Sequence, residues 1–519
     1  MSTTESGPAV VAKRLGWLLG AWRRTHPKHQ DPAVFLATLA DVLAERSGGH
    51  ADLECGPDQL AAWESGREAP PYDVVRAAEV VLGQQPGELA HLPAYLFIYH
   101  RMPVPAWTRP RLAPGTQEFV ERRAALVETV LESNPALQEW WELGHHLTAD
   151  PDVELAPETW EGLCRAAIAV LPRGVRAAHR TITQAAHALC DVPAAQPAMA
   201  RSIAAYLADP DVQVASLPIG MLERIPSREA GDLVLDLLEA GFSLRDSRLA
   251  IWVAAQKLRR GDLDDDQRTR LDLMLLGRWR SNSRATAANY AELISELPDS
   301  LREAFGEAAR QVGRGEVATA LTTGERMPAS MARDVSAAIS DKIMLLSCGF
   351  SDEGRTEDRE MLTQLCREAM FDLRSDRRHV ASVVLSASPF AGAITSCALD
   401  LLDRDDVPDV LRAHAAQLVQ YAAGEENRMR LHHYLDDPNE AVTFPAVHAL
   451  GHLPFSKVSD LELRRGMPAE DCLLGRSRMY ALGMTGSPAL GVLASGRAVP
   501  QWQAAAARWW LASGPSLQR

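Results

Sequence analysis

Apolar residues recur every three or four positions along most of this chain, and this spacing is typical of helices that bury one face. Three such segments lie near the amino terminus, at 12–24, 33–46 and 73–82. From residue 116 onward the pattern continues in stretches of about 15 residues. These stretches are broken by Pro, Gly and Asp, and little of the sequence alternates as a strand would. The pattern therefore predicts an all-α fold.

The stretch LAAWESGREAP, residues 60–70, carries the most specific local signal. Its glycine allows a left-handed exit from a helix, its last proline stops that helix, and its apolar side chains would fill the space between helices. This spacing resembles the XRE class of phage-repressor-type helix-turn-helix proteins. The class pattern of an apolar residue, Trp-Glu, Gly, a basic residue and Pro is met by Leu60, Trp63, Glu64, Gly66, Arg67 and Pro70. The resemblance implies a helix-turn-helix bundle over residues 1–92 that binds double-stranded DNA.

The resemblance also implies which residues meet the DNA. The positions of the recognition helix that would face the bases are Pro57, Asp58, Gln59, Ala61 and Ala62. There Gln is a standard reader of bases, Asp accepts from cytosine, and Ala contacts a thymine methyl group. Phosphate contacts would come from a basic cluster on and after the first helix and from the end of the recognition helix, namely Arg23, Arg24, Lys28 and Arg67. The segment 47–56 is longer than the family's turn, and its His50 is a further candidate contact.

The charges of residues 1–92 give evidence both against and for DNA binding. Residues 1–92 hold eight Lys and Arg against twelve Asp and Glu, whereas DNA-binding domains are usually basic. A local basic patch can still follow phosphates while the remaining surface stays acidic. The alternative is a bundle that keeps this fold but docks a protein, since a fold does not fix a function.

Residues 93–115 are rich in proline and carry Arg101, Arg109 and Arg111. This composition predicts a linker between the first domain and the rest of the chain. The linker would act either as a basic arm that enters a minor groove or as a strap that packs its aromatic rings on the next domain.

An internal repeat indicates the architecture beyond the linker. Residues 206–226 align with residues 434–454, and a third copy covers residues 402–419. The shared residues include an Asp-Pro pair, which is typical of the start of a helix. These segments resemble HEAT or armadillo repeats, and the resemblance implies an α-solenoid over residues 116–519 whose concave face suits a protein, a peptide or a nucleic acid. A plain globular helical domain is the alternative.

Two further features bear on such a solenoid. The tryptophan-rich helix at 500–512 is predicted to cap the end of the stack. Four arginine clusters are candidate contacts on the concave face, although charge runs on helices are most often solvated. The clusters are Arg173, Arg176 and Arg180; Arg259 and Arg260; Arg278, Arg280 and Arg284; and Arg374, Arg377 and Arg378.

Composition and missing motifs limit the remaining functions. The net charge of −14 over 519 residues argues against nucleic-acid binding by the bulk of the chain, so DNA contact is expected at one end only. The sequence has no run of about eighteen apolar residues and no secretion signal, which predicts a cytoplasmic protein. The seven cysteines are never spaced CxxC, so we expect reduced core residues without structural zinc. Catalytic and phosphate-binding motifs are missing, which predicts no enzyme, no cofactor and no metal site.

These observations lead to one hypothesis and two alternatives. The chain is predicted to be a bacterial transcriptional regulator that binds DNA as a homodimer, while its repeat region serves dimerisation or receives a ligand or protein signal. In the first alternative, the repeat region is a scaffold that grips a protein or peptide, and the helix-turn-helix has lost DNA binding. The second and weaker alternative is a HEAT-type DNA-repair glycosylase that uses dispersed Trp and Asp residues.

Overall fold

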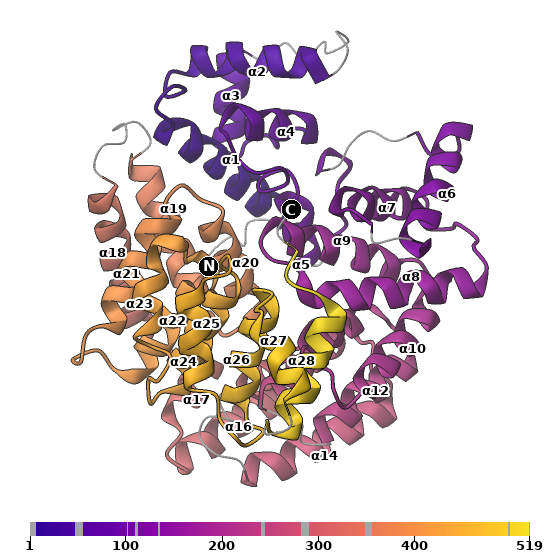
Figure 1. The fold of residues 1–519 in the computed structure, drawn as a ribbon. Helices are drawn as coiled ribbons and strands as arrows, with labels where there is room; N and C mark the ends of the chain where they lie inside the picture. The colour runs from indigo at the N-terminus through magenta and orange to yellow at the C-terminus, as the bar shows by residue number, and fades with distance from the viewer. Residues whose placement is uncertain are drawn as a thin grey trace.

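The computed structural model describes residues 7–46, 56–100, 102–108, 113–132, 135–239, 244–281, 290–347, 355–496 and 499–517. Every regular element in these ranges is a helix (Figure 1), and the other pairings are two isolated β-bridges, Gly174–Leu517 and Glu325–Asp372. The predicted all-α fold is confirmed for this part of the chain. A bilayer-spanning helix, which needs length and apolar character together, is absent from the described ranges. His50 lies outside them.

The first four helices form a small unit at the top of Figure 1: α1 (Gly7–Thr25), α2 (Pro32–Arg46), α3 (Pro57–Glu64) and α4 (Tyr72–Val81). α1 packs on α3, and α2 packs on α4. Leu60 and Trp63 of α3 are each only 2% exposed, so the apolar spacing in the sequence identified the buried face of this helix.

Two glycines allow α1 and the end of α3 to approach closely. A Cβ atom at Gly16 would lie 2.0 Å from the carbonyl oxygen of Trp63, and a Cβ atom at Gly66 would lie 2.4 Å from Cα of Lys13. Gly66 also has a φ of 70°, in the left-handed region that favours glycine. The left-handed helix exit predicted at Gly66 is therefore confirmed.

The expected linker begins with a buried helix. α5 (Leu92–Tyr99) has the sequence LPAYLFIY, which contains no charged residue, and Tyr95, Leu96 and Phe97 have no exposed surface. Burying this apolar run is favourable because it removes a large apolar area from water. α5 packs on α1, on α9 (Ala177–Asp191) and on α20 (Ser375–Ser386). Residues 92–99 are thus a central structural element and not a flexible connection, while Arg101, Arg109 and Arg111 lie outside the described residues.

Two arms of helices flank α5. The first arm descends on the right of Figure 1 and then runs along the bottom of the molecule. Its helices pack mainly on neighbours one or two places along the chain and share one hydrophobic core. It consists of α6 (Gln117–Glu132), α7 (Leu137–Ala149), α8 (Pro157–Val170), η2 (Leu171–Arg173), α9, α10 (Gln196–Leu207), α11 (Ser216–Met221), η3 (Leu222–Arg224), α12 (Arg228–Glu239), α13 (Leu244–Arg260), α14 (Asp265–Ser281), α16 (Asp299–Gln311) and α17 (Gly315–Thr323).

The second arm starts on the left of Figure 1 and passes to its centre, where its last helices lie below α5. Its hydrophobic core is continuous with that of α1 to α5, so the amino-terminal unit has no separate core. The second arm consists of α18 (Ala329–Leu346), α19 (Arg355–Phe371), α20, α21 (Ala391–Leu402), α22 (Asp409–Ala422), η4 (Glu425–Asn427), α23 (Arg428–His432), α24 (Glu440–Gly451), α25 (Lys457–Arg465), α26 (Leu473–Met484), α27 (Ala489–Ser495) and α28 (Gln501–Ser513).

The end of the second arm returns to the first arm. The Leu517 amide donates to the Arg173 carbonyl at 2.7 Å, and the Val175 amide donates to the Leu517 carbonyl at 3.2 Å. Just before this contact, α28 buries Trp510 against Tyr480 of α26, with 5.8 Å between the ring centroids. The tryptophan-rich helix therefore covers the last helices of the second arm, and the tail beyond it joins the two arms.

The repeated segments occupy equivalent local environments. The Asp209 carboxylate accepts from the Asp211 amide at 2.9 Å, and the Asp437 carboxylate accepts from the Asn439 amide at 2.8 Å. The core positions of both copies are buried as their alignment predicts: Ile219, Leu222 and Ile225 in one copy, and Val447, Leu450 and Leu453 in the other. The helix after the Asp-Pro pair begins closer to that pair in the second copy, at Glu440, than in the first copy, at Ser216.

Candidate functional site

The exposed face of α3 carries only part of the expected DNA-contact set. Asp58 and Arg67 are exposed, as is Lys28 after α1. The side-chain amide of Gln59 is half-buried and donates to the Glu68 carboxylate at 2.7 Å, so Gln59 is already engaged within the protein. Ala62 faces the core and is 8% exposed. A base contact by Ala62 is therefore excluded in this arrangement, and the exposed alanine of this helix is Ala61.

Arg23 and Arg24 point into the protein and not toward solvent. Arg23 is 1% exposed and makes a two-pronged ion pair with Glu64 of α3, at 2.6 and 3.0 Å. Arg24 pairs with Asp358 of α19 at 2.7 Å, and both side chains are buried. Phosphate contacts need exposed cations, so the prediction that Arg23 and Arg24 hold the DNA backbone is wrong, and both are structural residues.

The Arg24–Asp358 pair belongs to a larger interface between α1 and the second arm. Asp358 also accepts from the indole nitrogen of Trp17 at 2.9 Å. Trp22 donates its indole N–H to the Ala387 carbonyl at 2.8 Å, and Arg14 pairs with Glu368. Two arginines of α1, Arg14 and Arg24, therefore dock onto α19, while Arg23 of the same helix pairs with α3.

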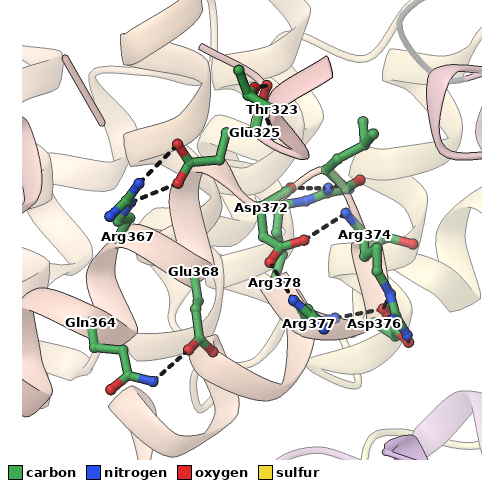
Figure 2. A network of polar contacts seen from close by, with 12 residues as sticks. Thr323, Glu325, Gln364, Arg367, Glu368, Asp372, Arg374, Asp376, Arg377 and Arg378 are labelled. Atoms are coloured by element: carbon green, nitrogen blue, oxygen red, sulfur yellow. Dashed lines mark hydrogen bonds and ion pairs between the residues drawn. The ribbon is translucent and has the colours of Figure 1, made fainter. Parts of the chain in front are cut away.

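The arginine clusters of the two arms are paired with acids or carbonyl groups in the same way. Figure 2 shows the cluster at the start of α20. Arg374 pairs with Asp376 at 2.6 Å, and Arg378 donates to the Asp372 and Leu373 carbonyls at 2.6 Å each. In the first arm the corresponding partners are Glu88 for Arg180, Glu296 for Arg259 and Glu223 for Arg260. The side chains of Arg278, Arg280 and Arg284 lie outside the described residues.

A second candidate site is a cavity of about 380 Å³ between the two arms, which we call the central cavity. Helices α5, α9, α11 and α13 line one side of it, and α20, α22, α24 and α26 line the other. Most of its surface is apolar or aromatic, and its size falls in the range of small-molecule sites. Its aromatic and imidazole rings are Tyr99, His179, His187, Trp252, His379, Tyr421, His448, His452 and Tyr480.

A chain of hydrogen bonds crosses the molecule beside this cavity. The hydroxyl group of Tyr95, on α5, lies 3.1 Å from Nε2 of His179 and 2.5 Å from Nε2 of His379. Nδ1 of His379 then lies 2.8 Å from the Tyr421 hydroxyl. Since one hydroxyl carries one proton, Tyr95 donates to one imidazole and accepts from the other. The chain therefore connects α9, α5, α20 and α22.

Both imidazoles of this chain are neutral near pH 7. Burial lowers the pKa of His179 to about 4, and the nearby Arg180 adds to this effect. Burial likewise lowers the pKa of His379 to about 3, with His179 contributing. The two groups therefore act as neutral donors and acceptors. Among the described residues, no group of three or more His, Cys, Asp or Glu is placed to hold a metal ion.

These pKa values predict a specific acid sensitivity. The unfolded chain takes up protons on these histidines below pH 6.5, whereas the folded chain does not until about pH 4 or 3, so stability falls as the pH drops through this window. His379→Gln should reduce the loss between pH 6.5 and 4.5 by about 2 kcal/mol. Urea unfolding at several pH values measures this loss. The same replacement at the exposed His433 should leave the wild-type profile, and an unchanged profile for His379→Gln would contradict the assignment.

Sequence reasoning did not identify the central cavity. Its rings come from segments far apart in the chain: His379 lies 284 positions from Tyr95. Single histidines and tyrosines on helical faces have no motif that marks them. The apolar run of α5 was the one available signal, because a charge-free helix must be covered on all sides.

Comparisons with known proteins add no family. No family model matches the chain, and neither does any curated protein. Among solved structures, the chain is similar to the crystal structure of an engineered protein. The two are 13% identical, the match covers 76% of this chain and 98% of that chain, and the TM-score is 0.23. A likeness at this level carries no argument about fold or function.

Proposed function

We propose that this chain is a DNA-binding transcriptional regulator. Helices α1 to α4 would be an XRE-type helix-turn-helix unit with α3 as the recognition helix, and the two arms would be a HEAT-like α-solenoid that receives a signal. The protein would bind paired half-sites as a homodimer, because one small head with few base contacts binds weakly.

The roles taken by the residues of α3 and its exit carry this proposal. Leu60 and Trp63 fill the contact with α1, and Gly66 leaves the helix in a left-handed conformation. Asp58 and Ala61 remain exposed on the opposite side. A recognition helix needs this division, with one face fixed to a supporting helix and the other open to a groove.

The arrangement of the arms supports a receiving role for the remainder. Successive helices pack on near neighbours in the chain, and the repeated segments bury equivalent positions. In a solenoid, stacked helix pairs create extended concave binding surfaces. The central cavity would then be the place where a signal enters.

DNA binding can be tested with the full chain and a pool of random duplexes, followed by anisotropy titrations at several salt concentrations. The double variant Lys28→Glu, Arg67→Glu should weaken binding to all sequences by about tenfold or more and lower the salt slope by about 2. Asp58→Ala should instead change the preferred bases, because Asp58 is exposed in the first turn of α3. The control is Arg201→Glu, Arg465→Glu, which makes the same charge change on exposed residues of the two arms.

The second candidate is a scaffold that binds a protein or peptide. It is favoured by the burial of Arg14, Arg23 and Arg24, which removes three cations from the surface of an already acidic unit. Under this candidate the full chain should show no salt-dependent, sequence-selective shift with any duplex. The same titration therefore separates the two functions.

A further inference from the structure

We propose that the central cavity is a binding site for a planar aromatic acid, a molecule with an apolar ring system and one anionic group. The existence of this binding site does not depend on DNA binding. The role of the bound acid as the signal of the regulator rests on the proposed function.

The walls of the cavity favour a flat aromatic body. Tyr480 and His448 stack with 4.4 Å between their centroids and an interplanar angle of 19°, and Tyr99 lies 4.8 Å from His379. Trp252 faces them from the first arm. Aromatic rings on several sides of a narrow space gain most from a ligand that can stack or meet them edge to face. A volume of about 380 Å³ accommodates a bicyclic ring system.

The charges around the cavity are balanced except at one residue. Arg180 pairs with Glu88, and Asp376 pairs with Arg374. Arg176 has no acidic partner among the described residues, and its guanidinium donates to the Ala423 carbonyl at 3.2 Å. That bond uses one of five N–H donors, so others remain for a carboxylate, which guanidinium groups bind in a two-pronged manner.

Arg176 lies at the neck of the cavity. Val175, Arg176 and His452 line both the central cavity and an outer hollow of about 610 Å³ that begins beyond them. An anionic group would therefore stay at this neck, near solvent, while the ring system enters the apolar interior. The neutral histidines inside provide hydrogen bonds without a second charge.

The backbone at Arg176 supports a functional position for its side chain. Arg176 is the one non-glycine residue with positive φ in the described part of the chain, with φ of 53° and ψ of −122°. Such a conformation costs about 1–3 kcal/mol and tends to occur where function requires it. The strain also places Arg176 directly before the amino terminus of α9, whose dipole adds to the attraction for an anion.

A ligand in the cavity would change the position of helices in the amino-terminal unit. His179 and His379 both line the cavity and bind the Tyr95 hydroxyl of α5, and α5 packs on α1. A ligand that shifts either imidazole therefore biases the position of α5 and of the helices around it. This connection gives the site a physical route to α3.

The test uses the purified full chain without DNA and three probes, followed by calorimetry and thermal melting. 2-Naphthoate should bind saturably at one site per chain and raise the melting temperature. 2-Naphthylmethanol, which lacks the charge, and cyclohexanecarboxylate, which lacks the flat rings, should each bind at least tenfold more weakly. Equal binding of the neutral probe would overturn the anionic assignment, equal binding of the saturated acid would overturn the aromatic one, and no saturable binding of 2-naphthoate would overturn the site.

Two pairs of variants locate the binding. Arg176→Gly removes the guanidinium while glycine accepts the positive φ, and it should weaken 2-naphthoate binding at least tenfold; Arg176→Lys should retain part of the affinity. A Cβ atom at Gly220 would make only ordinary contacts with Leu249 and Trp252, at 3.6 and 4.0 Å. Gly220 lines the cavity, so Gly220→Leu should fill it and abolish binding, whereas Gly491→Leu, at an exposed position of α27 where a Cβ atom meets nothing within 4 Å, should bind as the wild type does. Retained affinity in a folded Arg176→Gly or Gly220→Leu protein would overturn the proposal.

Discussion

Replacing Asp358 by alanine is expected to lower the free energy of unfolding by about 3–5 kcal/mol, because it leaves a buried cation without its partner. Asp358 accepts from Arg24 at 2.7 Å and from the Trp17 indole at 2.9 Å, and all three side chains are buried. The loss should appear as a lower urea midpoint when unfolding is followed by circular dichroism. It should also loosen the contact between α1 and the second arm.

Two matched variants make this prediction specific. Asp341→Ala removes a carboxylate from an exposed pair with Arg359, between the neighbouring helices α18 and α19, and should cost no more than about 1 kcal/mol. Asp358→Asn keeps an acceptor for the Trp17 indole and should fall between the alanine variant and the wild type. If Asp358→Ala were as mild as Asp341→Ala, the buried interface described here would be incorrect.

Gly16→Ala is expected to cost about 3 kcal/mol, at the upper end of the usual cost of overpacking. The added methyl group would meet the Trp63 carbonyl oxygen at 2.0 Å, and this neighbour is backbone that can move only if α3 moves. If α3 is the recognition helix, the same variant should also lower the apparent affinity for DNA, because only the folded fraction of the protein binds. Thermal melting and the anisotropy titration measure the two effects separately.

Gly491→Ala is the control for this substitution. Gly491 is exposed within α27, and a Cβ atom there would meet nothing within 4 Å. Alanine should stabilise this helix by about 0.5–1 kcal/mol, because glycine is the weaker helix former. A destabilisation at Gly16 together with a gain at Gly491 would attribute the effect to the contact between α1 and α3 and not to the change of residue type.

The sequence predicted the helices and their buried faces well. Helical periodicity is a local property, so Leu60 and Trp63 could be assigned to a core before that core was known. The left-handed turn at Gly66 was equally predictable, since few residues other than glycine favour that conformation. The aligned repeats identified Leu222 and Leu450 as equivalent buried positions for the same reason.

The sequence was less informative about side chains whose partners lie far away. Arg23 and Arg24 form part of a basic cluster in the sequence, which usually indicates an exposed patch. Their acidic partners stand 41 and 334 positions further along the chain, and only folding brings them within 3 Å. A guanidinium group is a phosphate contact or a structural ion pair depending on that partner, and no local pattern records it.

What this sequence determined by itself is an all-helical chain with known core-facing positions, because 3.6 residues per turn fix the spacing of apolar side chains. The tertiary structure decided which charges are buried, where α5 lies and that a cavity lined by His179 and His379 exists. These features arise from the way the two arms meet around α5, and that meeting depends on contacts between residues hundreds of positions apart.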